Sequence, residues 1–227
     1  MKDAKRSGYI DQVPEFPKLK GKNKVVAPPI RYISPADQMR IIEKIPQKHR
    51  PIFLFMMATG CRPAEARALR KSDIRGDGKI WFEVAFGRGE ELKTVKQAKS
   101  GYFPITEEVQ QIFDQQPRNL TQWMFPNPTT GKPYTKNINR IWNKACDDAG
   151  VKRINLYNAT RHSFACQMLN NGTDKGLVSR LLRHSDPRMI ERYAEYEEDP
   201  LRAAVEKVRR VDFTNKMQTN NTGDKNE

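Results

Sequence analysis

The sequence predicts an α+β domain that is mainly α-helical, with a small three-stranded antiparallel sheet inserted between helices. From residue 34 to 209, most apolar residues recur at helical spacing, and helix-start and helix-stop residues bound these stretches. Between residues 80 and 104 this pattern gives way to short β-rich runs around a glycine turn. Residues 1–30 and 211–227 are polar and lack a sustained period, so we expect a linker before the domain and a disordered tail after it.

Proline, serine and glycine set the limits of the first helices. Ser34 can cap free N–H groups and Pro35 has no N–H to satisfy, so a helix should begin there. The next helix is very apolar and should stop at Gly60, and Pro63 suits the first turn of a third. The helices expected in this part of the chain cover residues 35–45, 52–58 and 63–70.

The middle of the chain is expected to form the sheet. The run Ile80-Trp81-Phe82-Glu83-Val84-Ala85-Phe86 is β-rich, residues 87–91 resemble a turn, and residues 102–105 end the last extended run. Helical spacing then resumes. The later helices are expected at residues 106–115, 135–148, 158–170, 175–182, 187–196 and 200–209.

Charge favours a polyanionic partner. Lys and Arg number 41 against 27 Asp and Glu, which gives a net charge of +14 and a pI of about 9.8. No apolar run is long enough for a membrane span, no secretory signal opens the chain, and three cysteines lack paired metal-ligand spacing. Nucleotide-binding and metal-protease motifs are also absent, and the acidic residues do not cluster. We therefore expect a reduced cytoplasmic protein with no cofactor, metal or membrane partner.

Three short motifs and one tyrosine carry the chemistry. T-G-C-R-P-A-E occupies residues 59–65, R-H-S-F-A residues 161–165 and L-L-R-H-S residues 181–185, and Tyr193 follows nine residues after His184. In this order and spacing they resemble the active site of the tyrosine recombinases, the phage-integrase family. The resemblance spans about residues 30–200. It implies the catalytic domain of an enzyme that cleaves and rejoins DNA through a 3′-phosphotyrosine.

The resemblance assigns a role to each matched residue. Arg62 would hold a non-bridging oxygen of the scissile phosphate, with Glu65 orienting it, and Arg161 would be the second phosphate-binding arginine. His184 would hydrogen-bond the same phosphate, and Tyr193 would be the nucleophile. In isolation each has a simpler interpretation: an arginine paired on a helix surface, a histidine at a helix end, or a half-buried aromatic. A phenol with a pKa near 10 also needs nearby cations in order to attack.

The family carries its catalytic lysine in a hairpin turn, eight residues before a proline that ends the next strand. Counting back from Pro104 gives Lys96. The resemblance therefore implies that Lys96 protonates the departing 5′ oxygen and that Lys93 and Lys99 contact DNA phosphates. All three could equally belong to a solvated basic hairpin.

Two positions depart from the family pattern, and two others have competing interpretations. Asn158 stands where the family usually has histidine; its amide can donate a hydrogen bond to DNA but cannot accept the tyrosine proton at neutral pH. Arg183 replaces the usual glycine, and either adds a DNA phosphate contact or alters a turn. His162 is interpreted as structural, and Tyr196 is the one nearby competitor of Tyr193.

The resulting hypothesis is an integrase of a phage or mobile element that acts on double-stranded DNA. Residues 31–210 would be the catalytic domain, and residues 1–30 would be the linker from a missing N-terminal core-binding domain. The resemblance implies a homotetramer on DNA and a monomer when free. Two alternatives stay open: a type IB topoisomerase that relaxes DNA, and a DNA-binding module with weakened catalysis, which the Asn158 departure permits.

Overall fold

The computed structural model describes residues 6–9, 11–12, 31–95, 101–117, 119–135, 137–184 and 188–194. Several predictions concern residues outside these ranges and remain predictions. They concern Lys96, Lys99, Tyr196, the helix at 200–209, the tail at 211–227 and almost all of the linker at 1–30.

The first three helices form where their capping residues predict them. The Ser34 hydroxyl accepts a hydrogen bond from the Asp37 N–H and so caps the first helix. Gly60 ends the second helix at φ +60°, and a Cβ there would lie within 2.9 Å of the Phe164 and Leu182 side chains, so only glycine fits. These helices are α2 (Pro35–Lys44), α3 (Arg50–Thr59) and α4 (Pro63–Ala68).

The three-stranded antiparallel sheet is present, but its strands differ from the predicted ones. The run at 80–86 is not one strand, because the chain changes its pairing partner after Phe82. That residue is buried, and its N–H donates to the Gly101 carbonyl of one sheet, whereas the Glu83 carbonyl accepts from Val95 of the other. The sheets are β1 (Ile74–Arg75), β2 (Lys79–Trp81) and β5 (Tyr102–Pro104) in that order, and β3 (Val84–Phe86) with β4 (Leu92–Thr94).

The remaining helices agree with the predicted ones to within a few residues. The largest difference is the start of α6, three residues later than expected. None of the helices in the described ranges has the length and apolar character needed to cross a membrane. They are α5 (Glu107–Asp114), α6 (Ile138–Asp148), the π-helical turn η5 (Asn158–His162), α7 (Ser163–Asn170), α8 (Lys175–Leu181) and α9 (Arg188–Ala194).

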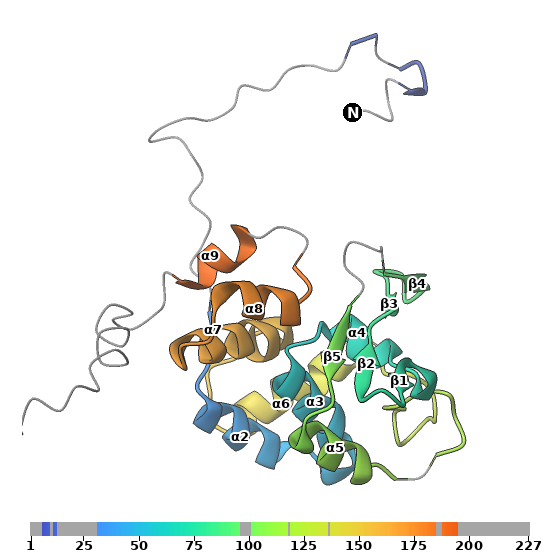
Figure 1. The fold of residues 1–227 in the computed structure, drawn as a ribbon. Coiled ribbons are helices and arrows are strands. Elements are labelled where there is room, and N and C mark those ends of the chain that lie inside the picture. The colour runs from blue at the N-terminus through green and yellow to red at the C-terminus, as the bar shows by residue number, and fades with distance from the viewer. Residues whose placement is uncertain are drawn as a thin grey trace, which may run out of the picture.

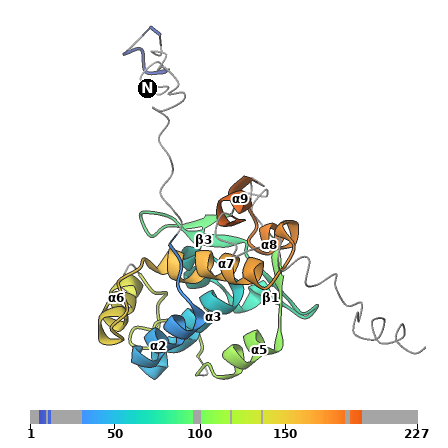
Figure 2. The same ribbon diagram turned by 90° about the vertical axis from the view of Figure 1, so that its left-hand side faces the viewer.

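Helix α3 is the centre of the packing. Phe55 on α3 contacts the rings of Phe82, Phe113 and Phe125, with ring centroids between 4.9 and 6.4 Å away. Figure 1 shows α7, α8 and α9 on one side and the strands on the other, and α4 packs against β3 and α3. Turned by 90°, Figure 2 shows α7 crossing over α3. The beginning of α4 therefore lies where the C-terminal helices approach the sheets.

Candidate active site

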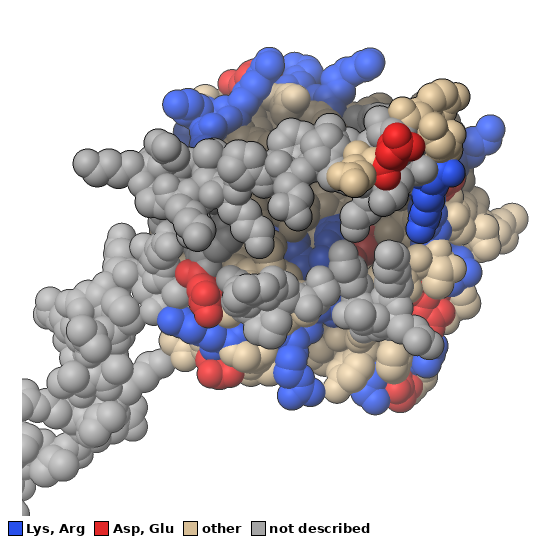
Figure 3. Space-filling model, turned by 90° about the horizontal axis from the view of Figure 1, so that it is seen from above, with Lys and Arg blue, Asp and Glu red and all other residues tan. Residues whose placement is uncertain are grey.

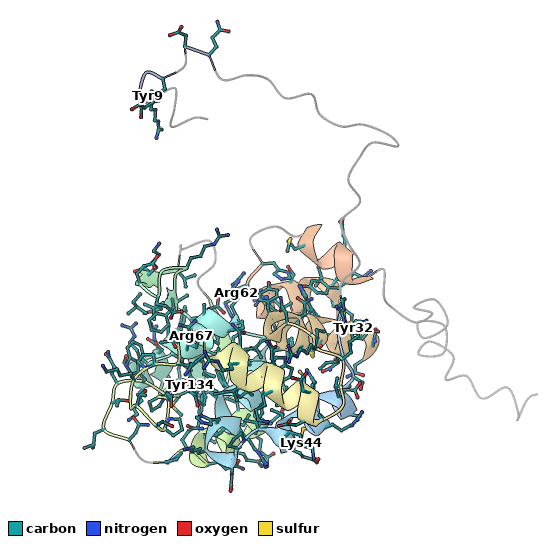
Figure 4. All side chains as sticks on the ribbon, turned by 180° about the vertical axis from the view of Figure 1, so that it is seen from behind. Tyr9, Tyr32, Lys44, Arg62, Arg67 and Tyr134 are labelled. Carbon is teal, nitrogen blue, oxygen red and sulfur yellow. The ribbon has the colours of Figure 1, made fainter. Side chains whose placement is uncertain are left out.

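Arg62 stands immediately before α4, and Glu65 in the first turn of that helix fixes its position. The Arg62 N–H donates to Glu65 Oε2 at 2.9 Å, and its guanidinium Nη1 donates to Glu65 Oε1 at 2.7 Å. Figure 4 shows Arg62 on the upper side of the folded part, above Arg67. The two bonds orient the guanidinium as the T-G-C-R-P-A-E motif predicted, because one carboxylate holds both the backbone and the side chain.

Glu65 also holds a second guanidinium. Arg183 Nη2 donates to Glu65 Oε2 at 2.6 Å, and both side chains are only 2% exposed. Burial acts to raise the pKa of Glu65, but the positive charges of Arg183 and Arg62 keep it below its usual value. Glu65 is therefore an anion that joins the beginning of α4 to the residue before His184.

Arg183 adopts the left-handed conformation that the usual glycine at this position would favour, with φ +52°. Its guanidinium lies over the Phe82 ring at 3.9 Å, and the side-chain stem lies against Gly101, whose added Cβ would be 3.0 Å from Arg183 Cγ. The side chain is directed into the protein. Of the two roles left open by the sequence, this geometry does not support a direct contact with DNA, and the turn itself keeps the conformation that a glycine would favour.

Arg161 joins two of the motifs through backbone carbonyls. Its side chain is fully buried, Nη1 donates to the Gly60 carbonyl at 2.9 Å, and Nη2 donates to the Leu182 carbonyl. Burial and the nearby Arg62 lower its pKa. A guanidinium has five N–H donors, and Nε has no partner within the described residues, so Arg161 still has donors for a ligand.

Tyr193 on α9 lies between two histidines. Its hydroxyl and His162 Nδ1 are 2.6 Å apart, and its ring stacks on His184 with centroids 6.1 Å apart and an interplanar angle of 8°. The Tyr193 side chain is 1% exposed. The structure thus brings Arg161, His184 and Tyr193 together and adds His162, for which the sequence predicts a structural role.

The residues around Tyr193 and His184 form a cluster with Arg62, Arg161 and Arg183. This cluster is positively charged and has hydrogen-bonding groups without a partner among the described residues. Arg161, Arg62 and Arg183 all act on His184 electrostatically, and neither of its ring nitrogens has a partner in the described part of the chain. Figure 3 looks down on the top of Figure 1 and shows Lys and Arg atoms at the base of a hollow in this face. Such a site suits an anion with several oxygens.

The pKa of His184 leads to a testable pH dependence. Burial, followed by Arg161 and Arg62, lowers this pKa from 6.5 to about 4. Between those values the unfolded chain binds the proton more tightly, so stability is full above pH 6.5 and falls as the pH decreases toward 4. We expect urea denaturation between pH 7 and 4.5 to show a shallower loss for His184→Gln than for the wild type. The lowered pKa of His49 acts in the same direction but is shared by both proteins. Parallel curves would contradict the prediction.

A pocket of about 490 Å³ opens beside Arg62. Its polar lining includes Asn139, Asn143, Asn155 and Tyr157, which come from α6 and the segment before η5. Neutral amides and a phenol can donate hydrogen bonds to phosphate or sugar oxygens without adding charge. The pocket therefore offers neutral hydrogen-bonding groups beside the anion site.

The other predicted site residues are Lys93, Asn158, Lys96 and Lys99, of which the structure describes the first two. Lys93 is exposed on β4 and pairs with Glu91 at 2.5 Å. Asn158 is half-buried; its N–H donates to Asn155 Oδ1, and its carbonyl accepts from Ser163 Oγ. Lys96 and Lys99 are not described. All three cysteines are free and buried, and within the described ranges no group of His, Cys, Asp and Glu gathers that could hold a metal.

Comparison with known proteins shows the family to which this chain belongs. The model of the Phage integrase family matches residues 33–199. The chain is 25% identical over 215 residues to the tyrosine recombinase XerC of Oceanobacillus iheyensis, covering 89% of this chain and 68% of the relative. It is 26% identical over 160 residues to XerC of Halalkalibacterium halodurans, covering 68% of this chain and only 52% of that relative. The chain belongs to the phage integrase family, whose tyrosine recombinases are DNA-cleaving and rejoining enzymes.

Solved structures show the same fold. The XerA recombinase matches with a TM-score of 0.61 and 20% identity, covering 83% of this chain and 67% of that one. The Tn1549 transposon integrase in complex with circular intermediate DNA matches with a TM-score of 0.62 and 22% identity, covering 80% and 68%. The catalytic domain of bacteriophage HP1 integrase has a TM-score of 0.56 and 21% identity, covering 78% of this chain and 94% of that domain. The α+β class predicted from the sequence is confirmed.

Proposed function

We propose that this chain is the catalytic domain of a site-specific recombinase that cleaves and rejoins double-stranded DNA through a 3′-phosphotyrosine. The observation that supports this most strongly is the convergence of Arg62, Arg161 and His184 near Tyr193, from segments far apart in the sequence. The net charge of +14 favours DNA as the polyanion.

In the proposed reaction, Tyr193 Oη attacks the scissile phosphorus and the bond from phosphorus to the 5′ oxygen breaks. Arg62 and Arg161 bind the non-bridging oxygens, where two guanidiniums stabilise the extra negative charge of the transition state. His184 donates a further hydrogen bond, and Lys96 protonates the departing oxygen. The 5′ hydroxyl of a partner strand then reverses the attack. Because the phosphotyrosine conserves the energy of the broken bond, rejoining requires no nucleotide.

The biological role we propose is integration or excision of a phage or mobile element in the bacterial cytoplasm, at the nucleoid. The similarity to the Tn1549 and HP1 integrases supports this role, although Xer recombinases are equally similar. We place the catalytic domain at residues 31–210, preceded by a linker and followed by a polar tail. A homotetramer would form on DNA, and the free chain would be a monomer.

The proposed reaction is tested by capture of covalent adducts. Purified protein would be incubated with a random-sequence library of nicked duplexes and with supercoiled plasmid. Adducts would then be isolated under denaturing conditions, and their DNA strands sequenced. We expect one enriched DNA site, attached through its 3′ phosphate to the tryptic peptide of residues 193–202, with fragmentation placing the phosphate on Tyr193 rather than Tyr196. DNA binding without any adduct would overturn the proposal in favour of a binding module. Plasmid relaxation without strand exchange between two enriched sites would favour a topoisomerase.

A further inference from the structure

We propose that His162 is a further catalytic residue, the base that accepts the proton of the attacking tyrosine. This inference rests on the proposed function, because it concerns the first step of the same cleavage reaction. The observation behind it is the 2.6 Å separation of His162 Nδ1 from the Tyr193 hydroxyl, within the range of a strong hydrogen bond and direct proton transfer.

The other groups near Tyr193 are less suited to this role. Asn158 occupies the position where a histidine base is expected, but an amide cannot accept a proton at neutral pH. His184 lies face to face with the Tyr193 ring rather than at its hydroxyl, and its pKa is lowered to about 4. Arg161 and Arg62 are permanently protonated and can only donate. His162, by contrast, combines a basic nitrogen with contact to the nucleophilic oxygen.

The local backbone explains how His162 reaches the tyrosine. Residues 158–162 form a π-helical turn, with the Ser163 N–H bonded to the Asn158 carbonyl, so this turn is one residue wider than an α-helical turn. The α-helical rule that residues three or four apart share one face therefore does not hold between Asn158 and the residues that follow it. The turn directs Arg161 to the carbonyls of Gly60 and Leu182 and His162 to α9.

Contacts on two sides hold the His162 ring. The Tyr157 ring meets it edge-on with centroids 4.9 Å apart and an interplanar angle of 86°, and the Tyr193 ring lies 5.2 Å away. Arg161 adjoins it in the chain, and His184 at the end of α8 is close enough to interact with it electrostatically. These contacts fix the orientation of the His162 ring, with Nδ1 directed at the Tyr193 hydroxyl.

Tyr193 Oη forms the bond to phosphorus while its proton passes to His162 Nδ1, and the bond from phosphorus to the 5′ oxygen breaks. The acid, proposed to be Lys96, supplies the proton for that oxygen. In the rejoining step the transfers reverse: His162 returns its proton to Tyr193 as the phosphotyrosine bond breaks.

The test compares His162→Asn with the wild type in single-turnover adduct formation on the enriched DNA site. Asparagine places an oxygen near the position of Nδ1 and can accept the hydrogen bond, but it cannot take the proton. We expect adduct formation to slow by about 10²–10⁴-fold at pH 7. The deficit should shrink as the pH rises toward the phenol pKa of about 10, where the phenolate forms without a base.

Two controls separate this role from a structural one and from the leaving-group acid. His49→Asn makes the same replacement at a matched histidine–tyrosine contact, His49 Nδ1 to the Tyr134 hydroxyl at 2.7 Å, and should not change the cleavage rate. A substrate with a sulfur in place of the bridging 5′ oxygen needs no acid, so it should not rescue His162→Asn. A wild-type rate for His162→Asn, a deficit independent of pH, or rescue by the sulfur substrate would overturn the proposal. If the wild type itself formed no adduct, the proposed function would fail and this inference with it.

Discussion

Tyr193→Phe is expected to abolish the covalent adduct completely while leaving DNA affinity within a factor of a few. The substitution removes one oxygen, the proposed nucleophile, and keeps the ring that stacks on His184. Loss of the bond to His162 should cost about 1 kcal/mol of stability, small enough for the protein to stay folded. A denaturing gel for the adduct and a mobility-shift titration for binding measure the two effects separately.

Tyr196→Phe is the matched control, because it removes the same hydroxyl from the neighbouring tyrosine three residues later. It should retain the adduct at the wild-type rate. The opposite pattern, with the adduct lost only in Tyr196→Phe, would show that Tyr196 and not Tyr193 is the nucleophile. It would also leave the contact between His162 and Tyr193 without a catalytic role.

Glu65→Gln is expected to be the most destabilising single change at the site, by about 3–5 kcal/mol. The substitution keeps the size of the side chain but removes the negative charge between Arg62 and Arg183, leaving the buried Arg183 cation uncompensated. Adduct formation should also slow by about 10²-fold, because Arg62 loses the group that orients it. Urea denaturation and single-turnover cleavage measure the two effects.

A double-mutant cycle makes this prediction specific. Arg183→Met alone removes a buried cation, and we expect Glu65→Gln/Arg183→Met to be more stable than the sum of the two single changes predicts. Asp148→Asn is the control for loss of an exposed carboxylate, since its ion pair with Lys144 lies on the surface of α6; its cost should stay below about 1 kcal/mol. Additive effects of the Glu65 and Arg183 changes would show that the buried ion pair contributes little.

Much of the helical framework could be predicted from local chemistry. Ser34 and Thr106 accept hydrogen bonds from N–H groups of the helices that they precede, and Gly60 ends α3, as their residue types indicate. The division of the run at 80–86 could not be predicted in this way. It depends on Phe82 entering the core and on Gly101 pairing with it from nineteen residues later.

The site was predictable in its residues but not in their contacts. Motif spacing placed Arg62, Arg161, His184 and Tyr193 in one active site, and the structure brings them together. The direction of Arg183 depends on Glu65, which is 118 residues away in the chain. The contact of His162 with Tyr193 spans 31 residues and depends on a π-helical turn that helical periodicity does not indicate. The sequence signals for His162 are its place in the R-H-S-F-A motif and the missing histidine at position 158.

The burial of Tyr193 has a consequence for its chemical reactivity. Reagents that nitrate or iodinate phenols modify exposed rings first, and Tyr9 and Tyr102 are 83% and 43% exposed, against 1% for Tyr193. The proposed nucleophile should therefore remain unlabelled in the free protein while these two tyrosines react. Any label that reaches Tyr193 would report an opening of α9 from the histidines, so a simple labelling time course could follow that movement without a DNA substrate.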